Sequence, residues 1–117
     1  MRPTKVNILG IEYSIAYVDK PSEVDIFKRE SYWGQIDYWT RTIRIYDSGS
    51  SRLNEDIFHS ILHEVLHGIA EALKLELRKN ERHDELDLLA LALTDVFFRN
   101  GWIAVAQSTL AVEVKSL

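Results

Sequence analysis

The spacing of the apolar residues changes once along this 117-residue chain, at about residue 54. Before that point hydrophobic and polar side chains mostly alternate, as in strands with one buried face. After it apolar residues recur every three or four positions, which is typical of amphipathic helices. We therefore expect an α+β fold, in which a small antiparallel or mixed sheet precedes two long helices. No repeat or linker interrupts the pattern, so residues 1–117 are expected to form one domain.

Four strands are expected in the first half of the chain. Their apolar residues alternate with polar ones, and turn-forming residues separate them. We place the strands at residues 5–8, 11–17, 35–39 and 42–46. After the second strand Asp19-Lys20-Pro21-Ser22 interrupts the alternation, and Ser22 is expected to cap a short helix at about residues 23–29.

The two long helices are expected at about residues 54–75 and 81–99. A charged, partly helical connection over residues 76–82 joins them, and Asn100-Gly101 ends the second one. The apolar face of the second helix is expected to consist of Leu86, Leu89, Ala90, Leu93 and Phe97. Residues 102–117 fit either a packing strand or a loose tail.

The first of these helices contains His63-Glu64-Val65-Leu66-His67. Residues four apart lie on one side of a helix, so both imidazoles can reach one metal ion while Glu64 projects beside them. This spacing suits two zinc ligands and the general base of a hydrolase. Both histidines flank the apolar stripe, where the core can hold them against a cleft. The alternative is two ordinary helical histidines with a solvated glutamate.

Catalytic zinc usually takes three protein groups and keeps one position for water. His83 is expected to supply the third group, because it extends the apolar face of the second helix; Glu85 and Asp84 are the alternatives. Asp87 lies one turn after His83 and is expected to accept a hydrogen bond from its ring, which would fix the tautomer. Without a metal, His83 would be a partly buried histidine at the start of a helix.

Neighbouring polar and aromatic residues are expected to play lesser roles. His59 should line the cleft or be exposed, since it lies about 12 Å from His67 along the helix axis. Glu71 should be a solvated surface acid. Aromatic side chains that could line a substrate groove, but more often cover a sheet, are Tyr32, Trp33, Tyr38, Trp39 and Tyr46.

Composition excludes several classes of function. The net charge is −4 and no basic cluster is present, which argues against direct nucleic-acid binding. The chain has no cysteine, so any metal must be held by His, Asp or Glu. No signal-peptide stretch is visible, and the most apolar segment, residues 86–98, is interrupted by charges and too short to cross a membrane. A cytoplasmic protein without membrane contact is expected.

The motif and the order of elements resemble the zincin metallopeptidases. Gly34-Gln35-Ile36-Asp37-Tyr38, Ile43-Arg44-Ile45, the motif helix over residues 61–69 and the leucine-rich closing helix look like small metallopeptidases of phages and bacteria. These are related in outline to the ImmA/IrrE-like minimal zincins. The resemblance covers roughly residues 6–100. In better-known gluzincins the third ligand is a glutamate in the second helix, whereas metzincins carry a third histidine where this chain has Leu73.

The resemblance implies a zinc-dependent peptidase acting on a peptide or protein. Zn²⁺ held by His63, His67 and His83 would lower the pKa of its water, and Glu64 would move the proton to the leaving amine. In zincins the strand before the motif helix borders the cleft, so residues 42–46 are expected to bind an extended peptide by strand addition. No residue stands out as the partner of the oxyanion among Tyr46, Tyr38 and His59.

Two other functions remain open. The chain could be a zincin-like regulatory or binding module with a mainly structural metal, inactive or dependent on a protein partner for activation. A metal-free helical interaction protein is the third hypothesis. A structural site closes with four protein ligands, whereas a catalytic one keeps a water.

Overall fold

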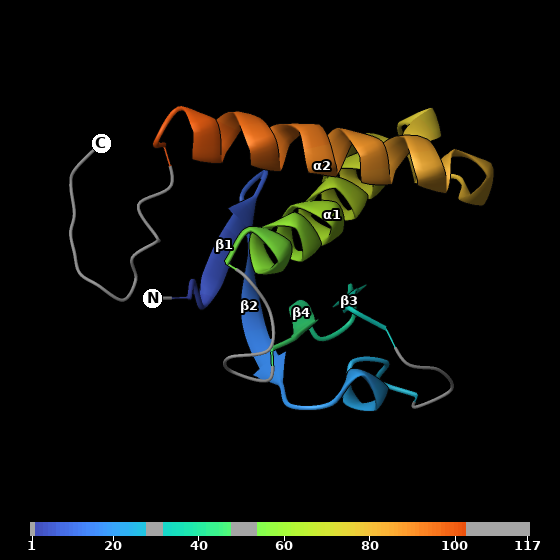
Figure 1. Ribbon diagram of the computed structural model, residues 1–117. Coiled ribbons are helices and arrows are strands. Elements are labelled where there is room, and N and C mark those ends of the chain that lie inside the picture. Colours follow the sequence, from blue (N-terminus) through green and yellow to red (C-terminus); the bar gives the residue numbers. More distant parts are fainter. Residues whose placement is uncertain (1, 28–31, 48–53, 103–117) are drawn as a thin grey trace.

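The computed structural model describes residues 2–27, 32–47 and 54–102. Within these ranges a four-stranded sheet comes first and two helices follow, which confirms the α+β prediction (Figure 1). The elements are β1 Lys5–Ile8, β2 Ile11–Val18, η1 Pro21–Glu23, β3 Gly34–Asp37, β4 Thr42–Tyr46, α1 Asn54–Leu73, η2 Glu76–Arg78, η3 Asn80–Arg82 and α2 His83–Arg99, where η denotes a single 3-10 turn.

The sheet is mixed, with the strand order β1-β2-β4-β3. β2 pairs with β1 in antiparallel and with β4 in parallel orientation, and β3 pairs with β4 in antiparallel orientation. A tight turn at Leu9 and Gly10, both with positive φ, joins β1 to β2 and matches the twist of a hairpin. Because β4 is paired on both sides, the expectation that residues 42–46 bind a peptide by strand addition is wrong. β3 lies at the edge.

One face of the sheet forms the core with α1. Isoleucines dominate this core, which consists of Ile8, Tyr13, Ile15, Ile43, Ile45, Ile57 and Ile61. The alternation in β4 is confirmed, since Ile43 and Ile45 are fully buried and their neighbours are not. Gly68 permits a close approach of α1 to the sheet, because a Cβ there would lie 2.9 Å from Ile8 Cδ1.

The short helix predicted at residues 23–29 is wrong over its described part. Only η1 forms, and residues 24–27 continue as turns. The reason is local hydrogen bonding: the buried Asp25 carboxylate accepts from the backbone N–H of Phe27 at 3.0 Å and from Gln35 Nε2 at 3.1 Å. Such a side chain competes with helix formation by satisfying a nearby backbone donor. Residues 28 and 29 lie outside the described residues.

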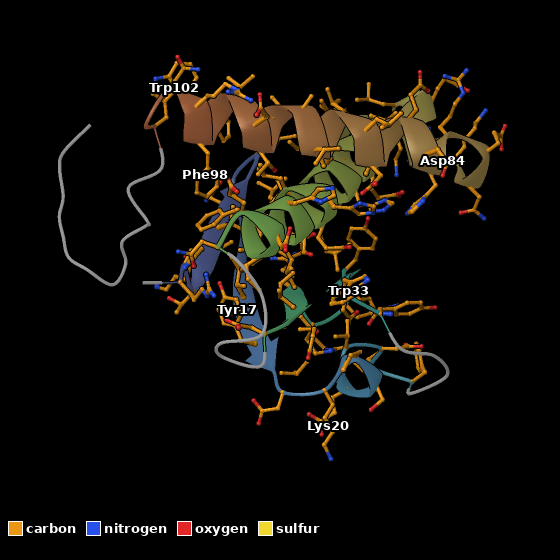
Figure 2. All side chains as sticks on the ribbon, in the orientation of Figure 1. Tyr17, Lys20, Trp33, Asp84, Phe98 and Trp102 are labelled. Carbon is orange, nitrogen blue, oxygen red and sulfur yellow. The ribbon has the colours of Figure 1, made fainter. Side chains whose placement is uncertain are left out.

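α2 crosses over α1 on the side away from the sheet (Figure 1). Its buried residues are Leu86, Ala90 and Thr94, and Phe98 meets Phe58 of α1 edge to face at 5.8 Å (Figure 2). The placement of Leu89 on the buried face is wrong, since this residue is 43% exposed. Thr94 lies on that face instead, and its hydroxyl donates a hydrogen bond to the Ala90 carbonyl at 2.8 Å.

The helix ends are close to those predicted. α1 ends at Leu73, and Lys74 follows with a φ of 56°. α2 begins at His83 rather than at residue 81, because Asn80–Arg82 forms a 3-10 turn first. Asn100 and Gly101, with a φ of 67°, end α2 as expected. The sequence fitted either a packing strand or a loose tail after the second helix. This prediction concerns mainly residues 103–117, which lie outside the described residues. Among the helices of the described residues, none has the length and apolarity that crossing a membrane requires.

Candidate metal centre

His63 and His67 lie in the middle of α1, one turn apart. Acidic residues in the first turn of this helix, Glu55 and Asp56, favour its N-terminus through the helix dipole. The isoleucines on its inner side bury it against the sheet. The two imidazoles therefore project from a well-packed helix, and their Nε2 atoms lie 3.1 Å apart.

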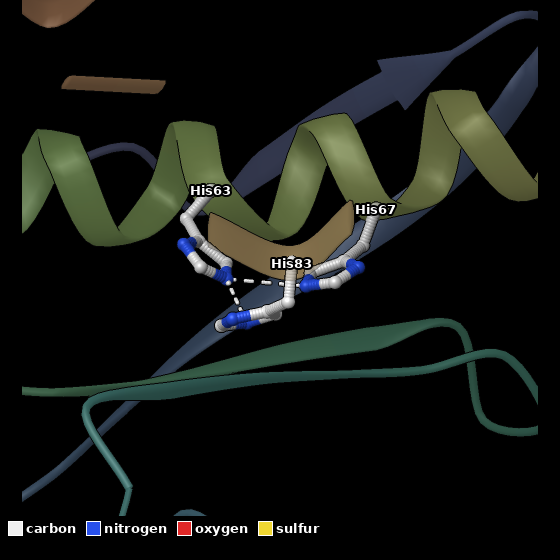
Figure 3. Close-up of side chains that lie close together, drawn as sticks. All are labelled: His63, His67 and His83. Carbon is white, nitrogen blue, oxygen red and sulfur yellow. Dashed lines mark hydrogen bonds between the residues drawn. The ribbon is translucent and has the colours of Figure 1, made fainter. Parts of the chain in front are cut away.

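His83 completes a group of three imidazoles. It is the first residue of α2, and the turns η2 and η3 bring it back over α1. Its Nε2 lies 3.1 Å from Nε2 of His63, so all three rings point toward a common centre (Figure 3). The alternatives for a third ligand do not join this group. Glu85 is exposed and pairs with Arg82 at 3.1 Å, and Asp84 is exposed.

The two Nε2 separations of 3.1 Å are compatible with a tetrahedral metal ion such as zinc. With Zn–N bonds of 2.0–2.1 Å, neighbouring nitrogens in such a site lie about 3.3 Å apart. Hydrogen bonds alone do not explain the arrangement. A neutral imidazole nitrogen that carries no proton has one lone pair in the ring plane, yet His63 Nε2 has a neighbouring ring nitrogen at 3.1 Å on two sides. A cation between the three rings would use one lone pair from each.

The carboxylate of Asp87 fixes the tautomer of His63. Its Oδ1 accepts a hydrogen bond from His63 Nδ1 at 2.6 Å and lies 3.0 Å from His59 Nε2. With its proton on Nδ1, a neutral His63 presents the Nε2 lone pair to the centre of the three imidazoles. We expected Asp87 to hold His83, one turn away on the same helix. It bonds instead to residues of α1, which faces it across the helix interface.

His63 and His67 are suited to bind a metal because their rings stay neutral. Burial lowers the pKa of His63, although the hydrogen bond to Asp87 opposes this shift. Burial also lowers the pKa of His67, to about 4, and the nearby His63 and His83 add to the effect. Metal binding requires unprotonated imidazole, so neither ring has to lose a proton at neutral pH.

His59 lines the same cavity, as expected, but its contact with Asp87 was not predicted. Together His59, His63 and Asp87 form a second group of potential ligands. The 2.6 Å between Asp87 Oδ1 and His63 Nδ1 is shorter than the separation of about 3 Å between neighbouring ligands of one metal ion. This second group is therefore a hydrogen-bonded arrangement. The sequence signal for this hydrogen-bonded arrangement was the row of histidines at 59, 63 and 67, together with an acid on the next helix.

Glu64 turns toward the sheet, where it is 7% exposed. Burial raises the pKa of this carboxyl to about 8, and a hydrogen bond from the Ile36 backbone N–H partly opposes the rise. Gly34 also lies close to Glu64, since a Cβ at this position would be 3.3 Å from Oε2 of Glu64. Residues 34 and 36 share one side of β3, so Glu64 faces the edge of this strand.

A cavity of about 820 Å³ opens between α1, β3 and the start of α2. All three imidazoles, Glu64 and Asp87 line it, together with Gly34 and Gln35 of β3. Within the described residues, no fourth His, Asp or Glu side chain joins the group of His63, His67 and His83. The cavity thus offers space beside the three rings for a water molecule or a substrate atom.

The five aromatic residues considered as possible lining of a substrate groove have different positions. Tyr32 and Trp33 line the cavity, and the Trp33 ring lies 5.5 Å from that of Tyr46. The Tyr38 hydroxyl donates to the His67 carbonyl at 3.2 Å, and burial raises its pKa to about 12. Trp39 is 95% exposed, so it does not cover the sheet as expected.

Glu71 forms an ion pair with Lys74 at 2.9 Å on the surface of the protein, in agreement with its expected role as a solvated acid. It takes no part in the group of histidines.

Comparison with known proteins adds no identification. A scan of protein-family models finds no match to this chain, and searches of curated proteins and of solved structures also find none.

Proposed function

We propose that this protein is a zinc-dependent metallopeptidase of the zincin type, in which His63, His67 and His83 hold the metal. The observation that supports this proposal best is the convergence of three Nε2 atoms, with two spacings of 3.1 Å, beside an open cavity. Three imidazoles and no thiolate form a donor set that suits zinc. The lack of a fourth protein ligand among the described residues favours a catalytic over a structural metal.

When bound, zinc would supply Lewis acidity, lowering the pKa of a water molecule and polarising the scissile carbonyl. In this proposal Glu64 acts as the general base. Its carboxylate would take a proton from the attacking water and deliver it to the nitrogen of the leaving amine. Burial raises the pKa of Glu64 to about 8, and a cation bound beside it would favour the ionised form that acts as the base. Asp87 would keep the Nδ1 proton on His63 throughout.

The open edge of β3 is the natural place for an extended peptide. β3 pairs with β4 on one side only, and its other side faces Glu64 through the N–H of Ile36. A peptide that adds to this edge as a strand would pass the base and the three imidazoles. β3 therefore replaces β4 as the proposed substrate-binding strand.

The test is a pair of measurements on one substitution. Wild-type protein should contain one zinc ion per chain by elemental analysis and should cleave members of a fluorogenic peptide library. Glu64→Gln should retain the zinc and the fold but lose at least about a hundredfold in rate, since the amide cannot accept the proton. Undiminished cleavage by this variant would remove Glu64 from the reaction.

The alternative is a zincin-like binding module whose metal is mainly structural. The observation that favours it is the shortness of β3, which has only four residues to receive a peptide. In that case the wild-type protein would hold zinc without cleaving any peptide of the library, and a partner protein would be needed for function. A protein that retained no zinc after metal-replete purification would contradict both proposals.

A further inference from the structure

α2 has apolar side chains on two opposite sides. The inner side, with Leu86, Ala90 and Thr94, packs on α1. The outer side carries a stripe at i, i+1, i+4 and i+8 that consists of Leu88, Leu89, Ala92 and Val96. Leu88 is 64% and Val96 is 39% exposed. A helix that is apolar on both sides is usually buried on both sides.

In the described residues, the elements that contact α2 are mainly α1, η2 and η3 (Figure 1). These elements lie on the inner side of α2 or at its start, and the outer stripe stays exposed. Contiguous apolar surface of this kind marks an interaction site in many soluble proteins.

The outer stripe is self-complementary about Ala92 except at Leu89, whose mirror position is Asp95. Leu88 and Val96 each lie four residues from it, on either side, and Glu85 and Arg99 each lie seven residues from it. If two copies of α2 run antiparallel with the Ala92 residues facing, leucine meets valine and glutamate meets arginine at both ends. This reciprocity is what a two-fold symmetric interface requires. The small alanine at the crossing point lets the two backbones approach.

We propose that the outer stripe of α2 binds the same stripe of a second copy of this chain, with the two helices antiparallel. One helix face covers less than the roughly 800 Å² per partner of a standard stable interface. The dimer should therefore be weak and depend on concentration. His83 and Asp87 face the other side of α2, toward α1, so this proposal does not depend on metal binding.

Sedimentation velocity tests the proposal on the full-length chain. The apparent mass should rise from 13.6 kDa toward twice that value as the concentration increases. Ala92→Glu places two like charges at the symmetry point and should give a monomer at every concentration. Ala72→Glu is the matched control, because Ala72 is an exposed residue of α1 away from the stripe, and it should leave the dimer intact.

A charge exchange tests the antiparallel orientation. Glu85→Arg or Arg99→Glu alone should weaken the dimer by placing like charges together, and the double exchange should restore it. Because the chain has no cysteine, Ala92→Cys should also form a disulfide-linked dimer on mild oxidation, whereas Ala72→Cys should not.

Wild-type protein that stays monomeric over about a hundredfold range of concentration would overturn the proposal. It would also be overturned if only a chain shortened by residues 103–117 dimerised, because that result would assign the stripe to those residues. A dimer that Ala92→Glu does not disrupt would place the interface elsewhere.

Discussion

Asp87 Oδ1 lies 2.6 Å from His63 Nδ1, and this contact joins α2 to α1 directly behind the three converging imidazoles. His63 is the ring whose Nε2 lies 3.1 Å from both other Nε2 atoms. The carboxylate therefore controls the orientation and the tautomer of the central member of the group. A second imidazole, His59, lies 3.0 Å from the same oxygen and helps to hold it.

The first prediction concerns Asp87→Asn. The amide keeps the shape of the side chain but can turn a donor toward His63 Nδ1, which would favour the wrong tautomer. Zinc affinity should fall about 10- to 100-fold, the usual cost of removing such a partner. Competition with a fluorescent chelator measures this change. Asp84→Asn is the control, because Asp84 is an exposed acid in the first turn of the same helix. Equal affinities of the two variants would contradict this role of Asp87.

The second prediction concerns stability with and without metal. The three imidazoles belong to both helices, so zinc should bind only the folded chain and stabilise it, by about 4 kcal/mol at free zinc a thousand times above Kd. Urea unfolding with zinc and with a chelator measures the difference. Without zinc, His83→Ala should unfold like the metal-free wild type, since His83 is exposed. With zinc, this variant should lose most of the stabilisation that the metal gives the wild type. If zinc stabilised His83→Ala as much as the wild type, the third ligand would be another residue.

The third prediction concerns alkaline pH. The Tyr17 hydroxyl donates to the Pro3 carbonyl at 2.6 Å, and burial raises its pKa to about 12, an effect that Arg2 opposes and Asp47 supports. Between about pH 10 and 12 the unfolded chain loses this proton first and the folded chain keeps it, so stability falls as the pH rises through this window.

Tyr17→Phe should therefore cost about 1 kcal/mol at neutral pH, the typical value of one hydrogen bond. The difference in free energy of unfolding between Tyr17→Phe and the wild type should shrink above about pH 10, where the wild type loses the contribution of Tyr17. Urea unfolding of both proteins from about pH 8 to 11 measures this difference. A deficit that stays constant over that range would show that the Tyr17 proton does not contribute.

The sequence predicted most elements because burial on one side leaves a periodic pattern. Ile43 and Ile45 alternate with polar residues because only one face of β4 meets α1. Three- and four-residue spacing likewise located α1 and α2. The same reasoning placed His63 and His67 together, since their contact depends only on the geometry of one helix.

Features that depend on two elements were harder to predict. An edge strand and an inner strand show the same alternation, so the sequence did not identify β3 as the edge. The partner of Asp87 depends on how α2 crosses α1, and helical spacing within α2 does not determine that angle. The structure brings His83 beside His63 and His67, at the start of the inner face of α2, and its role as the third ligand stays a prediction.

The last prediction concerns Gly34, where β3 passes closest to Glu64. A Cβ at this position would lie 3.3 Å from Cγ and from Oε2 of Glu64 and 3.1 Å from Cδ1 of Ile45. Ile45 is fully buried and Glu64 is held by the Ile36 N–H, so Glu64 has little space to move away. Gly34→Ala should displace the carboxylate by a few tenths of an ångström.

Because proton transfer depends on this position, kcat should fall about tenfold in Gly34→Ala. Zinc affinity should stay near the wild-type value, since the nearest neighbours of the added methyl group belong to Ile45 and Glu64 and not to the three imidazoles. Peptide hydrolysis and chelator competition on the same preparation separate the two effects. A variant with normal kcat would mean that Glu64 relaxes without loss, and a variant with weakened zinc binding would mean that α1 itself has shifted.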